Sequence, residues 1–222
     1  EPALKDVLHP DICAKALEEI AGRIEDIKKV RSVNDFLSLI PAEEQALLKK
    51  IWNCFLEDWE KASSMLDSSA RILKLEDTSI YLFVGPKVPL LPMIGSIKLF
   101  DLKAAGKDKL AQIIMVSAVS DSYTHVSVRA TGPKVHSGMI CHELQDSLRN
   151  RYPESKQLIS GGGHPVAAEC TVKTDKVTFL NVLTRVTEVL TEMDKLDKTY
   201  SNGSLNDEQK KRAKELGLDY IK

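Results

Sequence analysis

The sequence predicts an α/β protein, in which a helical N-terminal segment precedes a mixed β-sheet domain flanked by helices. Through the first third of the chain, apolar side chains recur at intervals of three and four residues, which indicates helices. After it, short runs rich in Val, Ile and Leu alternate with further helical patterns. We therefore expect a helical connector at 1–70, an α/β domain at 71–196 and a polar C-terminal tail at 197–222.

The connector is expected to contain three helices. Apolar spacing predicts one helix from about Pro10 to Ile27. A short helix beginning at Ser32 or Asn34 follows. Pro41 then opens a longer helix, because proline is tolerated in the first turn, and its apolar stripe runs to residues 66–70.

The first half of the expected sheet domain contains three strand patterns. Ile72–Leu75 and Ile80–Val84 flank a short polar stretch and predict a β-hairpin. Prolines and glycines at 85–95 predict a loop, and 97–102 fits either a short strand or a turn of helix. Leu110–Val119 is an almost continuous apolar run, which is typical of a strand covered on both faces.

The next strand alternates between apolar and polar residues. Val126 and Val128 are expected on one face, and His125, Ser127 and Arg129 on the other, because successive side chains of a strand point to opposite sides. The three polar side chains should therefore share one face of the sheet.

The remaining elements follow from spacing and capping residues. A helix is expected at His136–Arg151, a strand at Cys170–Val172 and a strong amphipathic helix capped by Thr174 or Asp175. The polar end of the chain contains a linker and a weak helix at 206–216, and we expect this tail to be peripheral.

Composition describes an ordinary globular protein, with 43% hydrophobic and 28% charged residues. The net charge of −1 gives no global positive field, so phosphate binding requires a local site. The four cysteines form no C-x-x-C pair, which favours free thiols over a zinc ribbon.

No apolar run is long enough to cross a bilayer and no signal peptide is recognised, so we expect a soluble intracellular protein without a membrane partner. The first residue, Glu1, is not Met, which indicates an excised fragment or a processed form.

The most informative segment is Ser160–His164, which reads Ser-Gly-Gly-Gly-His. Consecutive glycines are expected where the backbone needs positive φ or where a ligand approaches its N–H groups, which can form an anion-binding concavity. His164 adds a side-chain donor, and Pro165 is expected to open a short helix whose N-terminus faces the anion. The alternative is a flexible glycine turn that binds nothing.

With Pro165 and the alanines after it, this segment resembles the GGGH-x-x-A-A-G motif of the accessory C-terminal domain in DHH-family phosphoesterases. That family includes RecJ-type single-strand nucleases, oligoribonucleases and cyclic-dinucleotide phosphodiesterases. Val126–Ala130 is similar to the V-S-L-R-S strand that precedes the motif, and the resemblance covers about Arg71 to Met193. Glu169 replaces the final glycine of the motif and brings a negative charge to the expected anion site.

The resemblance implies roles for individual residues. Arg129 would hold a phosphate through its guanidinium, and His164 would contact the same or an adjacent phosphate. Without the motif, Arg129 fits a solvated strand charge or a salt bridge. The expected phosphate- or substrate-binding residues are Arg129, Gly161, Gly162, Gly163 and His164, with Ser127 and Ser160 as secondary candidates.

The catalytic half of that family binds two metals through Asp and His clusters that include Asp-His-His. This chain has no Asp-His-His, and its five histidines are scattered. His142 and Glu143 fit a solvated helix surface better than a metal site. We therefore expect no catalytic residue, metal ligand or cofactor in this chain, whereas the resemblance implies manganese or magnesium in a separate catalytic half.

Three functions remain open. The first is a phosphate-binding domain that binds a short single-stranded nucleic acid or nucleotide while a catalytic domain hydrolyses it. Its protein partner would be that catalytic domain or a second copy of this chain. The second is a non-catalytic protein–protein adaptor that keeps the fold and docks through its helical first third. The third is a tRNA-binding accessory domain like that of alanyl-tRNA synthetase, against which the near-neutral charge counts.

Overall fold

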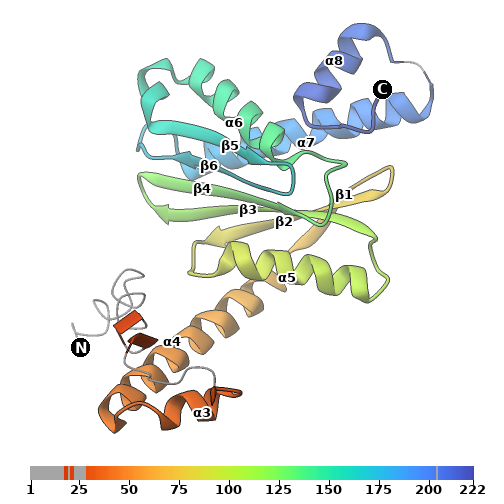
Figure 1. Ribbon diagram of the computed structural model, residues 1–222. Helices are drawn as coiled ribbons and strands as arrows, with labels where there is room; N and C mark the ends of the chain where they lie inside the picture. The colour runs from red at the N-terminus through yellow and green to blue at the C-terminus, as the bar shows by residue number, and fades with distance from the viewer. Residues whose placement is uncertain (1–17, 20, 23–28, 204) are drawn as a thin grey trace. The chain divides into compact units, whose positions relative to one another are not determined.

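The computed structural model describes residues 18–19, 21–22, 29–203 and 205–222 (Figure 1). The chain divides after Glu60 into two units, Glu1–Glu60 and Lys61–Lys222. The first expected helix, Pro10–Ile27, lies outside the described residues except for helical turns at 18–19 and 21–22. In the part of the chain that is described, no helix has the length and apolar character needed to cross a membrane.

Two helices follow in the order that the sequence predicts. α3 spans Val33–Ser38, and the side chain of Ser32 caps it by accepting a hydrogen bond from the backbone N–H of Asp35 at 3.1 Å. α4 spans Ala42–Leu66 and begins directly after Pro41. Ser32 is therefore the correct one of the two expected starts.

The sheet has six strands in the order β1-β2-β3-β4-β6-β5. β2 and β3 are parallel, and every other neighbouring pair is antiparallel. The hairpin expected at the start of the domain is confirmed as β1–β2. The strands are β1 (Ala70–Leu75), β2 (Thr78–Pro86), β3 (Leu110–Ser120), β4 (Tyr123–Ala130), β5 (Ile159–His164) and β6 (Ala167–Val172).

A helix, α5 (Leu91–Ala104), connects the parallel strands β2 and β3. The sequence predicted a loop at 85–95, which is wrong for the second half of that range. Pro92 lies in the first turn of α5, where a proline removes no intrahelical hydrogen bond. The undecided stretch 97–102 belongs to the same helix.

Helices cover both faces of the sheet (Figure 1). α5 lies over β3 and β4, whereas α6 (Ser137–Arg151) and α7 (Phe179–Ser201) pack against the opposite face. Val126 and Val128 are fully buried in the core on the α6 and α7 side, as the alternation of β4 predicts. A short 3-10 helix, Pro153–Leu158, joins α6 to β5.

The N-terminal cap of α7 is Thr178 and not Thr174 or Asp175, the two residues that the sequence predicted. Thr178 accepts a hydrogen bond from the backbone N–H of Asn181 at 3.2 Å, and the Asn181 side chain accepts one from the backbone N–H of Thr178 at 2.9 Å. This reciprocal capping box starts the helix three or four residues later than Thr174 or Asp175 would.

The C-terminal stretch is part of the core, which corrects the expectation of a peripheral tail. α8 spans Asp207–Glu215, and the backbone N–H of His136 donates to the carbonyl of Gly217 at 2.7 Å. An isolated bridge also pairs Val135 with Leu218. The expectation rested on the polar composition of this stretch, but four of its apolar side chains are buried, namely Ala213, Leu216, Leu218 and Ile221.

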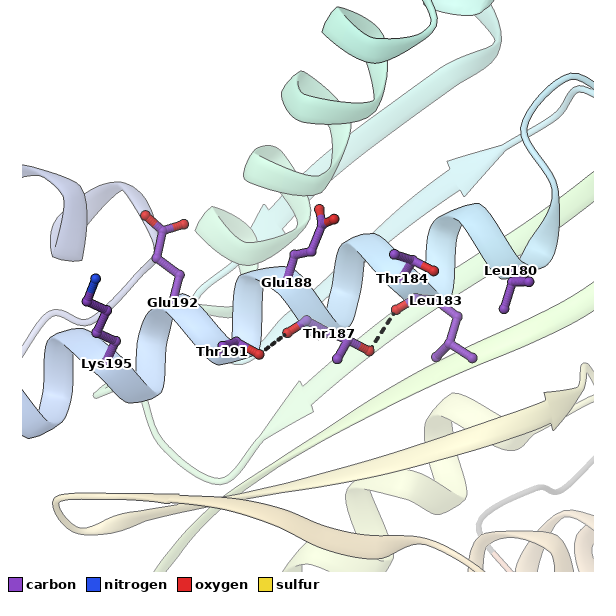
Figure 2. A pocket seen from close by; sticks show the side chains of 8 residues that line it. All are labelled: Leu180, Leu183, Thr184, Thr187, Glu188, Thr191, Glu192 and Lys195. Atoms are coloured by element: carbon purple, nitrogen blue, oxygen red, sulfur yellow. Dashed lines mark hydrogen bonds between the residues drawn. The ribbon is translucent and has the colours of Figure 1, made fainter.

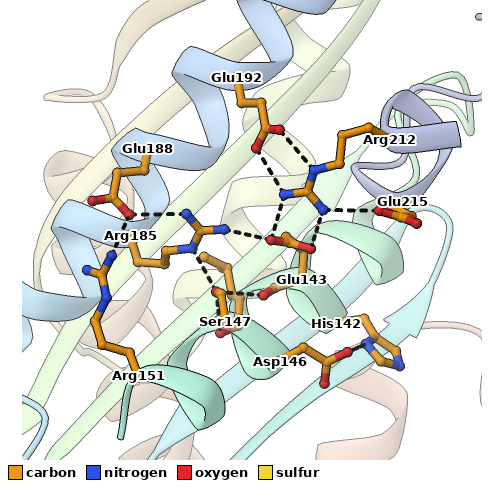
Figure 3. A network of polar contacts seen from close by, with 11 residues as sticks. His142, Glu143, Asp146, Ser147, Arg151, Arg185, Glu188, Glu192, Arg212 and Glu215 are labelled. Atoms are coloured by element: carbon orange, nitrogen blue, oxygen red, sulfur yellow. Dashed lines mark hydrogen bonds and ion pairs between the residues drawn. The ribbon is translucent and has the colours of Figure 1, made fainter. Parts of the chain in front are cut away.

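An ion-pair network holds α8 against α6 and α7 (Figure 3). Arg212 of α8 donates to both carboxylate oxygens of Glu143 on α6, each at 2.9 Å, and to both oxygens of Glu192 on α7, also at 2.9 Å. Arg185 of α7 donates to Glu143 at 2.6 Å. Glu143, with 14% of its side chain exposed, is therefore bound by two arginines and does not lie on a solvated helix surface.

Candidate functional site

The glycine-rich segment forms β5, a strand at the edge of the sheet, and not a loop. β5 turns through Pro165 and Val166 into β6, so the helix expected to begin at Pro165 is absent and that expectation is wrong. The carbonyl of Pro165 accepts a hydrogen bond from the backbone N–H of Ser137 at 2.8 Å, at the start of α6. The tip of this hairpin is therefore tied to α6.

Gly161 allows α6 to approach β5 closely. A Cβ atom at this position would lie 2.2 Å from the carbonyl oxygen of Cys141, a distance that backbone atoms cannot accommodate without moving. The N–H of Gly161 donates to the Gln145 side chain at 2.8 Å. This amide is therefore already bonded, and packing against α6 is one physical reason for the glycine.

The other two glycines have backbone conformations that favour glycine. Gly162 and Gly163 have φ values of 140° and 142°. A Cβ on Gly163 would lie 2.7 Å from the Cα of Ala168, whereas the space beside Gly162 is open. Gly162 thus leaves room on the surface of the sheet.

Arg129 and His164 lie on the same face of the sheet. In register, Arg129 of β4 faces Ala167 of β6, and Ala167 faces His164 of β5. Since Ala168 is buried on the α6 side, its neighbour Ala167 points to the opposite face, where both Ala167 and His164 are exposed.

Arg129, Ala167 and His164 form a row of residues paired across the three strands. Two further rows of this kind extend the surface, which we call the β4–β6–β5 face. The second row contains Ser127, Glu169 and Gly162, and the third contains His125, Thr171 and Ser160. Five of the seven expected site residues, namely Arg129, His164, Ser127, Ser160 and Gly162, occupy these three rows, whereas Gly161 and Gly163 alternate toward α6.

The guanidinium of Arg129 is fixed by three acceptors. Its Nη1 donates to the carbonyls of Val128 at 3.0 Å and Ala168 at 3.1 Å, and its Nη2 donates to Oε1 of Glu169 at 3.1 Å. Only 17% of the side chain is exposed. Since Ala168 and Glu169 belong to β6, these contacts hold the guanidinium over the β4–β6 pair.

Glu169 has a second partner, His125, whose Nε2 lies 3.1 Å from Oε2 of Glu169. Burial lowers the pKa of His125 and outweighs the opposing effect of Glu169, so the imidazole is neutral at pH 7. Burial alone would raise the pKa of Glu169, but hydrogen bonds from His125 and Arg129 outweigh it and the pKa is lowered. The surface therefore contains an ionised carboxylate next to Arg129.

Sequence reasoning identified Glu169 as a departure from the motif but missed both of its partners. His125 was assigned to the correct face of β4 and was not recognised as part of the site. The missing information is the register of β4 against β6, which brings residues about 40 positions apart into contact and leaves no local signal in the sequence.

The two serines differ in accessibility. Ser127 is buried, and its hydroxyl has no hydrogen-bond partner among the described residues. Ser160 is exposed, and its hydroxyl lies 2.7 Å from that of Thr171.

Metal-ligating side chains are dispersed over the described part of the chain. Within 18–19, 21–22, 29–203 and 205–222, no group of three or more His, Cys, Asp or Glu side chains is positioned to hold a metal ion. His142 is exposed and pairs with Asp146 at 3.0 Å (Figure 3).

A hollow on α7 has a different chemical character (Figure 2). The hydroxyl of Thr187 donates to the carbonyl of Leu183 at 3.0 Å, and that of Thr191 donates to the carbonyl of Thr187 at 2.8 Å. Because these hydroxyls bond to their own helix, the hollow presents mainly apolar groups. It lacks the convergent donors that a phosphate requires.

No family model matches the chain, and no curated protein matches it in sequence. Solved structures with partial structural similarity to the chain include two of low sequence identity. One, the DHH domain of a member of a family of ribosomal proteins, is 15% identical with a TM-score of 0.42, and the match covers 84% of this chain and 43% of that chain. The other, the C-Ala domain of alanyl-tRNA synthetase from Aquifex aeolicus, is 16% identical with a TM-score of 0.36, covering 54% of this chain and 96% of that chain.

At these identities each likeness concerns the fold alone, and the chain spans less than half of the DHH-domain protein.

Proposed function

We propose that this chain is a phosphate-binding domain for short single-stranded nucleic acids or nucleotides, and that it works with a DHH-type catalytic domain. The observation that supports this most is the row formed by Arg129, Ala167 and His164. Neighbouring strands lie about 4.8 Å apart, so Arg129 and His164 flank a gap of about 10 Å above a small alanine. A guanidinium and an imidazole on either side of such a gap can donate to one phosphate group.

Arg129 is well prepared for this role. Three of the five N–H donors of a guanidinium are used by Val128, Ala168 and Glu169, which leaves two for a ligand. Because the two carbonyls already fix the side chain, binding costs little rotamer entropy. A phosphate must share Arg129 with Glu169, so we expect moderate affinity.

Hydrolysis belongs to the separate catalytic domain in this proposal. There, two divalent metal ions would activate water and stabilise the oxygens of an in-line displacement. The residues of this chain would bind and orient the phosphate and exclude part of the water around it.

A second candidate function is a protein–protein adaptor. It is supported by apolar side chains around a groove formed by α3 and α4, where Trp52 is 57% exposed and stacks on Phe55 with ring centroids 5.3 Å apart. Exposed aromatic side chains of this kind are enriched at protein interfaces.

Both candidates can be tested by binding measurements with a mononucleotide, tetranucleotides of DNA and RNA, and a tRNA. For the phosphate site, Arg129→Ala and His164→Ala should each weaken binding of the short ligands about 5- to 30-fold, which corresponds to roughly 1–2 kcal/mol for a charge-assisted hydrogen bond. Arg129→Lys keeps the charge, loses the planar fork and should give an intermediate loss.

Lys211→Ala is the matched control, since it removes an exposed positive charge on α8 and should leave affinity unchanged. Circular dichroism should show that each variant is folded. Unchanged affinity in both Arg129→Ala and His164→Ala would contradict the phosphate site and favour the adaptor. Much tighter binding of tRNA than of tetranucleotides would favour the tRNA-binding alternative.

A further inference from the structure

Glu169 occupies the centre of the β4–β6–β5 face. It lies between Ser127 and Gly162 in register, one row from Arg129 and His164. Its side chain is 47% exposed. Whatever binds at Arg129 and His164 therefore also meets the carboxylate of Glu169.

This carboxylate is held in place with hydrogen-bonding capacity left over. Oε1 accepts from Arg129 and Oε2 from His125, both at 3.1 Å. A carboxylate has about four acceptor positions, so each oxygen has about one lone pair still available. Because half of the side chain is exposed, this remaining capacity is accessible from solvent.

An ionised carboxylate discriminates among the groups of a nucleotide. It repels phosphate oxygens, which carry the same sign of charge, and accepts hydrogen bonds from hydroxyl groups. Carboxylates bind ribose hydroxyls in this way in dinucleotide-binding proteins. The open space beside Gly162, directly across from Glu169, leaves room for a sugar ring.

We infer that Glu169 accepts a hydrogen bond from the ribose 2′-hydroxyl next to the bound phosphate, so that the site prefers short RNA over short DNA. This inference rests on the proposed function. The 2′-hydroxyl is the group by which a protein can distinguish RNA from DNA at a given site, and it is the donor that this acceptor requires. Arg129 and His164 contact the phosphate, which both nucleic acids share, and Glu169 contacts the sugar, in which they differ.

The test compares three tetranucleotides of one base sequence: RNA, DNA and 2′-O-methyl RNA. The wild-type chain should bind RNA about 5- to 10-fold more tightly than DNA, as expected for one partly exposed hydrogen bond to a charged acceptor. The 2′-O-methyl form keeps an acceptor and loses the donor, so it should bind like DNA.

Glu169→Ala should bring the ratio of RNA to DNA affinity to about one. Glu169→Gln keeps an acceptor oxygen and the shape of the side chain, and should retain part of the preference even if Glu169→Ala folds poorly. Glu154→Ala removes an exposed glutamate outside the site and should keep the wild-type ratio.

The outcomes separate this inference from the proposed function. Equal wild-type affinity for RNA and DNA, with both weakened by His164→Ala, would overturn the sugar preference and leave the phosphate site intact. A preference that persists in Glu169→Ala would also overturn it, since another group would then recognise the sugar. Binding that His164→Ala and Arg129→Ala do not weaken would overturn both.

Discussion

Arg129 and Glu169 form an ion pair between β4 and β6, with 3.1 Å between Nη2 and Oε1. The two residues are diagonal neighbours, since Arg129 faces Ala167 and Glu169 faces Ser127 in register. Diagonal positions on a sheet are within reach of long side chains. The cation expected to bind a phosphate is therefore positioned and partly neutralised by the same carboxylate.

This pairing predicts that Glu169→Gln binds a DNA tetranucleotide more tightly than the wild-type chain does. The substitution removes a negative charge from the site and releases part of Arg129. We expect about a 2- to 5-fold gain, which is the range of a partly exposed ion pair. Fluorescence anisotropy at low and high salt would measure it; a loss of affinity at both salt concentrations would contradict the account.

Because the C-terminal stretch is buried, we expect Leu216→Ala to destabilise the chain strongly. Leu216 caps the C-terminus of α8 and is fully buried in the core, so truncation should lower the free energy of unfolding by about 2–4 kcal/mol. Leu180→Ala removes the same atoms from a side chain that is 66% exposed, and should change stability by about 0.5 kcal/mol or less. Urea unfolding distinguishes the two; equal effects would mean that the tail is peripheral.

Glu143 should stabilise the chain in a pH-dependent way. Burial alone would raise the pKa of Glu143, but Arg212 and Arg185 outweigh it and hold the pKa below its ordinary value of 4.5. Because the folded pKa is lowered, this stabilisation is present above pH 4.5 and is lost as the pH falls through the lowered pKa.

We accordingly expect Glu143→Gln to cost about 1–3 kcal/mol at pH 7, the range of hydrogen bonds to charged groups. The difference from the wild-type chain should shrink below pH 4.5. Thermal unfolding at a series of pH values checks this, with Glu154→Gln as an exposed control. A difference that stays constant from pH 7 to pH 3 would rule out the titration of Glu143 as its cause.

Gly161→Ala should disrupt the packing of α6 on β5, because its Cβ would approach the backbone oxygen of Cys141 to 2.2 Å. We expect destabilisation of about 2 kcal/mol or more, as for overpacking against an element that cannot yield. Gly162→Ala places its Cβ in open space and should cost about 1–2 kcal/mol through its positive φ alone. Chemical unfolding of both variants tests this order; the reverse order would show that α6 yields readily.

Periodicity in the sequence was sufficient for the central part of the fold. The alternation of Val126 and Val128 with His125, Ser127 and Arg129 predicted which side chains share a face, because a strand has a strict period of two. The capping serine of α3 and the proline before α4 also predicted helix starts correctly.

Other features depend on tertiary context. Pro165 was expected to open a helix, but the pairing of β5 with β6 makes it part of a hairpin turn. The tail was expected to be peripheral because its buried residues, such as Leu216 and Ile221, are separated by charged ones. The contact between Arg129 and Glu169 requires the register of two strands, β4 and β6, that α6, a 3-10 helix and β5 separate in sequence.

The central claim is that Arg129 and His164 bind one phosphate, and nuclear magnetic resonance of the isotope-labelled chain tests it most directly. A nucleoside monophosphate and the corresponding nucleoside would be titrated in parallel, and the Arg129 Nε–H and His164 ring signals followed. The account predicts that both signals shift together with the monophosphate and stay in place with the nucleoside. Equal shifts with both ligands, or shifts confined to α3 and α4, would contradict it.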